Sequence, residues 1–199
     1  MSGYTDGRIA WPARMLEQAR IRHAARRAGS APEAARIAGR TAGYMLRKDL
    51  HGACYALSCA MWIALREEGL DPVLRLGACA CGDGPDPGVP FDHGWIVLDG
   101  KPLDVAIAMP AGNPGWERGP VAAGVDLDTG RPCRVAYGVP KPPGADIEAI
   151  LAMGFGRYCD WFPRERDGIW TVAAMIIGRG ARADRLRRKY VGADPFRTA

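Results

Sequence analysis

The sequence predicts an α+β fold in which a central helix packs on an antiparallel sheet, with further helices before and after this core. Apolar residues at helical spacing between about residues 53 and 68 predict the central helix. Two short apolar segments, separated by the two-residue turn Asp99-Gly100, predict a β-hairpin. Helical patterns over residues 13–48 and 169–190 predict the flanking helices.

Two helices are expected in the N-terminal segment. Residues 13–28 are rich in Ala, Arg and Leu, which favour helix, and Gly29 ends this helix. Ser30 predicts the N-cap of a second helix over residues 31–48, with Glu33 at the third position as in a capping box.

The central helix carries one apolar stripe, and Gly69 ends it. Residues 72–77 then predict a strand, and the Gly- and Pro-rich residues 82–90 predict a loop. In the hairpin, a strand over residues 91–98 is expected to pair with a strand over residues 101–106. Five residues define the stripe on the helix: Leu57, Ala60, Met61, Ala64 and Leu65.

No internal repeat and no clear linker divides the chain, so a single domain over residues 1–199 is expected. Its core lies at about residues 50–108, preceded by a helical extension over 1–49 and followed by an extension over 109–199. The second extension is predicted to contain an irregular segment at 110–130, a strand at 131–137, a proline-rich connector at 139–144, a short helix at 147–153, and a C-terminal helix at 169–190 with a weak point at Gly178 and Gly180.

Composition favours a globular protein of the cytoplasm. Hydrophobic residues make up 48% of the chain, which is typical of a globular domain. The first residues lack the pattern of a signal peptide, and the longest apolar stretch, residues 169–177, is shorter than the ~20 residues of a membrane helix. A cytoplasmic location without membrane contact is therefore expected.

The net charge of +5 is unevenly distributed. Residues 1–50 hold ten Lys and Arg against four Asp and Glu, residues 51–178 hold ten against sixteen, and residues 179–199 hold seven against two. The basic ends could bind nucleic acid or an acidic partner. Solvated helix faces, or packing of the ends near the acidic middle, are the favoured interpretation, and nucleic acid is not favoured as a partner.

The six cysteines are expected to be reduced thiols, because no secretory signal is recognised and no CxxC motif occurs. Cys79 and Cys81 would share one face of a strand. A metal site built from this pair with Cys133 or Cys159 is a disfavoured alternative, because a structural zinc ion normally takes four ligands at recognisable spacing. Neither a metal ion nor another cofactor is predicted.

Cys54 is the candidate nucleophile. It stands at the start of the central helix, where free backbone N–H groups and the helix dipole favour a thiolate. The backbone N–H of Cys54 could also stabilise an oxyanion, while Gly52 allows a tight turn and leaves room for a substrate.

His93 and Asp104 are the candidate base and its orienting carboxylate. They lie on the two strands of the predicted hairpin, near its open end, so the carboxylate could orient the imidazole and stabilise its cation. Trp95 is expected on the same strand face as His93, as a shield against water or as core.

Each candidate also has a simpler interpretation. Cys54 could be a buried structural thiol, as is expected of Cys59, and His93 could be a satisfied core histidine. His51, three residues before Cys54, is a rival base with nothing to orient it. The joint placement of nucleophile, base and carboxylate favours the catalytic interpretation.

Two segments resemble the core of the transglutaminase-like cysteine enzymes. Residues 52–77 (GACYALSCAMWIALREEGLDPVLRLG) place a Cys at a helix start, and Gly69 follows fifteen residues later, at a turn similar to the family's turn from helix to strand. Residues 92–106 (DHGWIVLDGKPLDVA) resemble the family pattern H-x-W-[VI]-x-[VL]-x-G-x-x-[IL]-D. The resemblance covers residues 50–108 and is closest to the compact bacterial transglutaminase-like peptidases, which include those that process lasso peptide precursors.

The resemblance implies a papain-like core and cysteine-dependent acyl transfer through a thioester intermediate. A thiol peptidase or amidase acting on a peptide, or on another amide or ester, is expected, since water is the default acceptor. The alternative is a catalytically retired transglutaminase-like fold that binds an acidic protein or nucleic acid. The complete set of Cys54, His93 and Asp104 favours the enzyme, whereas the substrate and the oligomeric state are not predicted.

Overall fold

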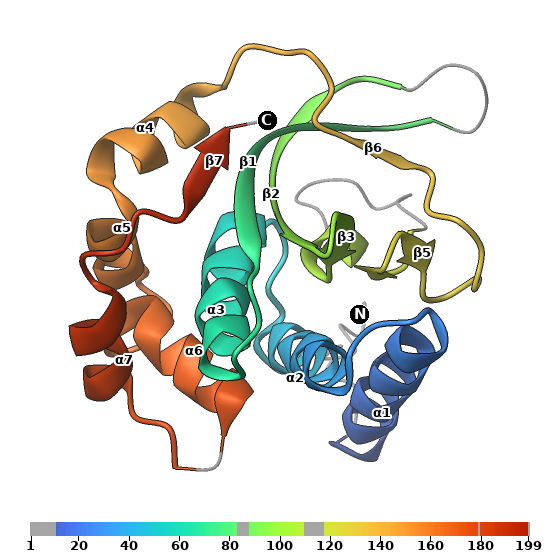
Figure 1. Cartoon of the computed structure of the whole chain (residues 1–199), viewed down its shortest axis with the longest axis horizontal. Coiled ribbons are helices and arrows are strands. Elements are labelled where there is room, and N and C mark those ends of the chain that lie inside the picture. The colour runs from blue at the N-terminus through green and yellow to red at the C-terminus, as the bar shows by residue number, and fades with distance from the viewer. Residues whose placement is uncertain (1–10, 83–87, 110–117, 179, 199) are drawn as a thin grey trace, which may run out of the picture.

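The computed structural model describes residues 11–82, 88–109, 118–178 and 180–198. Within these ranges the fold is α+β, with seven α-helices and a curled, mainly antiparallel sheet (Figure 1). The predicted fold class is confirmed at this level. None of the helices in the described ranges is long and apolar enough to cross a membrane.

Two N-terminal helices, α1 (Trp11–Arg27) and α2 (Pro32–Lys48), pack against each other. The predicted cap at Ser30 is wrong. Helix α2 has Ala31 as its N-cap residue, without a side-chain cap hydrogen bond. Pro32 explains the difference, because proline is favoured at the first helical position and thereby sets the cap one residue after Ser30.

Helix α3 (Cys54–Glu67) has nearly the predicted bounds and occupies the middle of the molecule (Figure 1). The predicted apolar stripe is buried, but so are residues on its other sides, including Cys59 and Ile63. Strands β1 (Val73–Cys81) and β2 (Phe91–Leu98), helix α2 and helix α6 (Gly168–Ile177) contact α3 from different directions. A helix enclosed in this way is a fixed base for a residue at its first position.

In the described part of the chain the sheet has seven strands: β1 (Val73–Cys81), β2 (Phe91–Leu98), β3 (Lys101–Asp104), β4 (Val121–Ala122), β5 (Val125–Asp126), β6 (Val135–Tyr137) and β7 (Phe196–Thr198). Their order is β5-β4-β3-β2-β1-β6, and β7 also pairs with β1. All pairings are antiparallel except that of β1 with β7. One edge of β1 is therefore shared by two strands from the C-terminal half of the chain.

The hairpin is confirmed, and its first strand has the predicted bounds. Strand β3 ends at Asp104 rather than at residue 106, because the chain turns there into a short 3₁₀ helix, η1 (Ala106–Ala108). Strand β1 runs four residues further than predicted, through both cysteines of the close pair. Strands β4 and β5 form a small hairpin within a segment predicted to be irregular, and the central residues 83–87 of the predicted loop lie outside the described residues.

Four helices, α4 (Ala145–Met153), α5 (Phe155–Trp161), α6 (Gly168–Ile177) and α7 (Ala183–Tyr190), lie on the side of α3 away from the sheet (Figure 1). The prediction of one continuous helix over residues 169–190 is wrong. Gly178, with φ +66°, ends α6 at the predicted weak point, and a separate helix follows. The Arg40 guanidinium donates to the Ile177 carbonyl and so stabilises this end.

Apolar side chains are buried on both faces of the sheet. The main core lies between the sheet and the helices and includes Leu76, Ile96 and Leu103. Cys79 and Trp95 are equally well buried but lie outside this cluster. Strand alternation explains the division, because successive side chains point to opposite faces.

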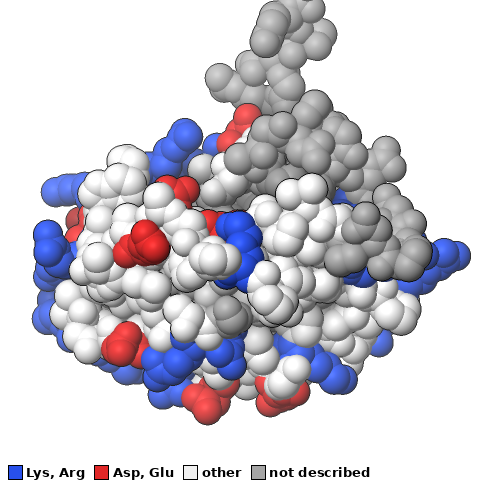
Figure 2. Space-filling model, turned by 90° about the horizontal axis from the view of Figure 1, so that it is seen from above, with Lys and Arg blue, Asp and Glu red and all other residues white. Residues whose placement is uncertain are grey.

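Ion pairs link the basic ends to the acidic middle of the chain. The expectation that the ends pack near the middle is confirmed at these positions. Lys and Arg side chains gather toward the edges of the face seen in Figure 2, with Asp and Glu among them. The linking pairs are Arg20–Asp128 (2.6 Å), Lys48–Glu165 (2.7 Å), Arg187–Asp160 (2.8 Å) and Lys189–Glu67 (2.6 Å).

Candidate active site

Cys54 is the first residue of α3, as predicted, and its side chain is buried. The chain enters the helix through Gly52, whose φ of +65° suits glycine and whose N–H donates to the Met109 carbonyl at 2.9 Å. N–H groups in the first turn of a helix have no partner within the helix, and they carry its positive dipole end. The thiol therefore lies at the end of the helix that favours negative charge.

Strand β2 brings His93 to this helix end. Gly94 allows the approach, because a Cβ built at this position would lie 3.3 Å from the Tyr55 Cα and 2.9 Å from its ring. The Ser58 hydroxyl donates to the Gly94 carbonyl at 2.8 Å and ties the strand to α3. A residue with a side chain would keep the strand and the helix apart.

Asp104 terminates β3 and is almost fully buried beside His93. Its Oδ2 lies 2.7 Å from Nε2 of His93, and its Oδ1 accepts from the Ile107 N–H at 3.1 Å. The ladder between β2 and β3 ends at the Ile96–Leu103 pair, so the chain can turn away and aim the carboxylate at the imidazole. The sequence prediction that these two residues meet is confirmed.

His93 interacts with both other members of the predicted triad. Nε2 of its ring faces Asp104, and the Cys54 side chain lies near enough to act on the pKa of the imidazole. Burial alone would lower the pKa of His93, but the Asp104 carboxylate and the Cys54 side chain outweigh it and raise that pKa to about 10. These neighbours therefore favour the imidazolium form of His93.

Aromatic rings enclose the imidazole. Trp95 stacks on His93 with ring centroids 6.4 Å apart and planes at 11°, and Phe91 meets it edge-on at 5.8 Å. Trp95 is buried, and its predicted position on the same face as His93 is confirmed. These rings keep water from the buried ion pair.

The sequence prediction missed Tyr137. This residue ends β6, and its hydroxyl donates to Oδ2 of Asp104 at 3.0 Å. Its ring packs against Trp95 with centroids 5.2 Å apart. A strand had been expected at this place in the chain, but no local pattern indicates that it pairs with β1 and so reaches Asp104.

His51, the rival base, faces away from this buried group. Its imidazole is 56% exposed, and its Nε2 lies 3.3 Å from the exposed Asp49 carboxylate. This contact orients His51 toward solvent-exposed partners. Its proximity to Cys54 in sequence therefore does not place it among the buried catalytic candidates.

The other five cysteines have surroundings that suit structural thiols. Burial raises the pKa of Cys79 and Cys159, and it also raises that of Cys133. Within the described parts of the chain, no group of three or more His, Cys, Asp or Glu side chains is placed to hold a metal ion. Cys59, Cys79 and Cys159 are buried, whereas Cys81 and Cys133 are partly exposed.

A proline-rich strap over residues 138–144 lies against Asp92 of strand β2, beside the site. Lys141 forms an ion pair with Asp92, the neighbour of His93. Gly144 lies directly against the same carboxylate, because a Cβ at this position would collide with Oδ2 of Asp92. The N–H groups of Gly138 and Val139 donate to the Ala78 carbonyl and fix the start of the strap.

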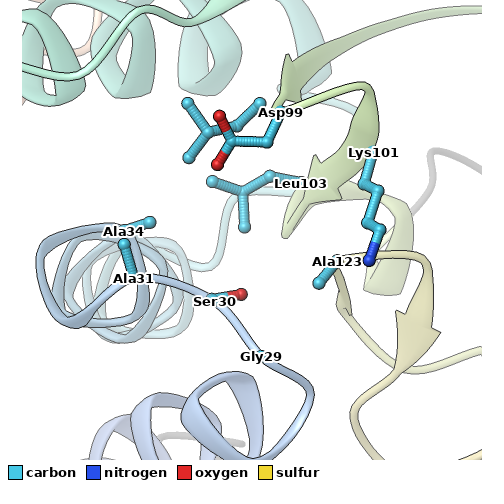
Figure 3. Close-up of a pocket in the computed structure, with 9 residues that line it drawn as sticks. Gly29, Ser30, Ala31, Ala34, Asp99, Lys101, Leu103 and Ala123 are labelled. Atoms are coloured by element: carbon cyan, nitrogen blue, oxygen red, sulfur yellow. The ribbon is translucent and has the colours of Figure 1, made fainter.

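The pocket in Figure 3 lies at the other end of the hairpin. It has a volume of about 170 Å³ and lies between the start of α2 and the β2–β3 turn. Asp99 and Lys101 line it, whereas His93 and Asp104 lie at the open end of the same hairpin. This pocket is thus separate from the buried Cys–His–Asp group.

Comparison with known proteins gives no relative from which a function could be transferred. A scan against models of protein families found no match, and neither a search of curated proteins nor a search of solved structures found one. The chemistry of the site must therefore be inferred from its own residues.

Proposed function

We propose that this protein is a cysteine-dependent acyl-transfer enzyme, a peptidase or amidase of the transglutaminase-like kind, with Cys54, His93 and Asp104 as its catalytic residues. One observation carries the proposal above all. A buried imidazole lies 2.7 Å from a buried carboxylate and interacts electrostatically with a cysteine at the first position of a helix. Nucleophile, base and orienting group in mutual contact are the signature of nucleophilic catalysis.

The order of the elements supports the proposed kinship. The cysteine helix is followed by a strand, then by the histidine strand, and then by the aspartate strand. The resemblance in sequence implies this same order. The whole constellation lies within residues 50–108, where that resemblance was found.

The proposed reaction begins with the Cys54 thiolate attacking the carbonyl carbon of an amide. A tetrahedral oxyanion forms, and the N–H groups at the start of α3 stabilise it. As the C–N bond breaks, protonated His93 gives its proton to the leaving amine, and a thioester remains on Cys54. Neutral His93 then takes a proton from water, hydroxide attacks the thioester, and the acid product leaves. Thiolate and imidazolium are restored.

Competitive alkylation of the six thiols tests the nucleophile. Exposure alone would make Cys81 and Cys133 react first, because both are less buried than Cys54. The proposed site instead requires Cys54 to react fastest, since thiolate is the reactive form and His93 stabilises it. Iodoacetamide at pH 7, followed by peptide mass mapping over time, should show Cys54 modified at least tenfold faster than the other five.

The matched variant is Cys54→Ala. It should retain the circular dichroism spectrum of the wild type and lose all turnover of substrates identified with a library of electrophilic peptides. Faster labelling of Cys81 or Cys133 than of Cys54, or equal turnover by wild type and Cys54→Ala, would sink the proposal.

The alternative of a retired core that binds an acidic partner is less well supported. Several basic side chains of the termini already pair with carboxylates of the middle, such as Arg20 with Asp128 and Lys189 with Glu67. The same alkylation experiment separates the two functions, because a retired site would label slowly at Cys54.

A further inference from the structure

We propose that Tyr137 is a positioning residue of this site, whose hydroxyl holds the Asp104 carboxylate in place and weakens the hold of that carboxylate on the proton of His93. The inference rests on the proposed function, because it assigns Tyr137 a role in the same reaction. Tyr137 would touch neither the substrate nor the sulfur. It would act through Asp104.

The hydrogen bonds of the carboxylate carry the first step. Oδ2 of Asp104 lies 2.7 Å from Nε2 of His93 and also accepts from the Tyr137 hydroxyl at 3.0 Å. Oδ1 accepts from the Ile107 N–H at 3.1 Å. Three donors from three separate segments thus fix the carboxylate, which can accept about four hydrogen bonds. Tyr137 and His93 share one oxygen, so the hydrogen bond from each donor weakens the hydrogen bond from the other.

Strand pairing and ring packing hold the Tyr137 side chain in a fixed position. Strand β6 pairs with β1 so that Tyr137 lies opposite Cys79, and the Tyr137 ring packs on Trp95, which in turn stacks on His93. Burial, followed by the negative charge of Asp104, raises the pKa of the Tyr137 phenol well above its usual value. The hydroxyl therefore remains a neutral donor throughout the working range of pH.

The shared oxygen has a chemical consequence. The groups that face His93 from neighbouring elements are Cys54 on α3 and Asp104 on β3, while Cys79 on β1 lies near Asp104 as a neutral thiol. Within this set, the Tyr137 hydroxyl draws charge from the oxygen that holds the imidazolium. His93 is then a stronger acid than it would be beside an unshared carboxylate, so it releases its proton more readily to a leaving amine.

Tyr137→Phe tests this role, because it removes the hydroxyl and keeps the ring against Trp95. NMR titration of the ¹⁵N-labelled His93 imidazole should show its midpoint rise by roughly 0.5 to 1 pH unit, a part of the energy of a hydrogen bond to a charged group. The matched control is Tyr44→Phe, which removes another tyrosine hydroxyl that donates to a carboxylate, that of Glu165, at 2.9 Å. This control should leave the His93 midpoint unchanged.

A second measurement uses the wild-type protein and so does not depend on the folding of a variant. The ¹³Cζ signal of Tyr137 should shift with the same midpoint as the His93 ring, because both donate to one oxygen. An unchanged or lowered midpoint in Tyr137→Phe, or a Tyr137 signal that ignores the titration of His93, overturns the positioning role. Alkylation of Cys54 is scored separately. If Cys54 is labelled slowly while the Tyr137 and His93 signals still titrate together, the proposed enzyme is refuted. The positioning of Asp104 by Tyr137 is then still supported.

Discussion

At the scale of single residues, the candidate site depends on a carboxylate that is completely enclosed. Asp104 is 1% exposed and receives hydrogen bonds from a side chain or backbone group on each of its oxygens. A buried charge is costly unless it is paired and hydrogen-bonded, and His93 supplies the pairing cation. The two residues are therefore interdependent, and a change at either should disable the other.

Asp104→Asn tests this dependence. The amide is neutral and cannot stabilise the imidazolium, so turnover should fall by a factor on the order of 10⁴, as when the orienting carboxylate of a catalytic triad is replaced by an amide. The matched control is Asp99→Asn in the exposed turn of the same hairpin, where a left-handed φ of +53° is tolerated by Asn. Steady-state kinetics should show wild-type turnover for the control, and similar losses in both variants would refute the role of Asp104.

At the scale of elements, the site depends on the close approach of β2 to the start of α3. Gly94 is the point of contact, and it lies between His93 and Trp95 on the strand. A small residue is needed here because the neighbouring atoms include the backbone of Tyr55, which cannot move aside as a side chain can. The spacing between the His93 imidazole and the Cys54 thiol is thus set by a residue that takes no part in the proposed chemistry.

Gly94→Ala should separate the strand from the helix. The new methyl group would lie 2.9 Å from the Tyr55 ring, and overpacking of this kind costs about 1–3 kcal/mol in free energy of unfolding. The rate of Cys54 alkylation at pH 7 should fall at least tenfold, because His93 moves away from the sulfur. Gly192→Ala is the control, since a Cβ there meets nothing within 4 Å. If Cys54 in Gly94→Ala were alkylated at the wild-type rate, this account of the site would be contradicted.

Elements with strong local signals could be predicted from the sequence. Helix α3 and the hairpin were found because apolar spacing and the Asp99-Gly100 turn are local patterns. The cap of α2 was misplaced because Ser30 and Glu33 fit a capping box, while Pro32 fixed the helix start. Helix α5 and strand β7 were missed, since a seven-residue helix and a three-residue strand depend on packing partners distant in sequence.

The same distinction applies to the site. The sequence predicts that Cys54, His93 and Asp104 lie close together, because a helix start and one hairpin position all three. Tyr137 could not, since its place depends on β6 pairing with β1 more than fifty residues earlier. Contacts made across a sheet between distant segments leave no periodic pattern in the sequence, so only the structure shows them.

At the scale of the whole molecule, the buried pair should couple global stability to pH. The pKa of His93 is about 10 in the folded protein and near 6.5 when unfolded. The folded state therefore holds this proton more tightly. The stabilisation that results is fully present below about pH 6.5 and is lost as the pH rises through about 10.

Urea unfolding between about pH 8.5 and pH 10 checks this coupling, because above the ordinary pKa of a thiol the unfolded Cys54 no longer binds a proton that offsets the one on His93. The free energy of unfolding should fall with increasing pH across this window, with a slope of up to about 1.4 kcal/mol per pH unit from His93. Asp104→Asn should show a flatter dependence over the same range, because the group that raises the pKa is gone. Parallel curves for the two proteins would show that the pair contributes no pH-dependent stability.

The shared edge of β1 has a consequence for folding during synthesis of the protein. Strands β6 and β7, which complete that edge, come from residues 135–137 and 196–198. When the ribosome has synthesised the chain as far as η1, the cysteine, the histidine and the aspartate have all been made, yet the nascent chain still lacks Tyr137 and helix α6, which packs on α3. A growing polypeptide therefore carries Cys54 in an unfinished setting. The hydrogen bond of Tyr137 to Asp104 can form only after residue 137 has been synthesised, so the three site residues are made before their surroundings are complete.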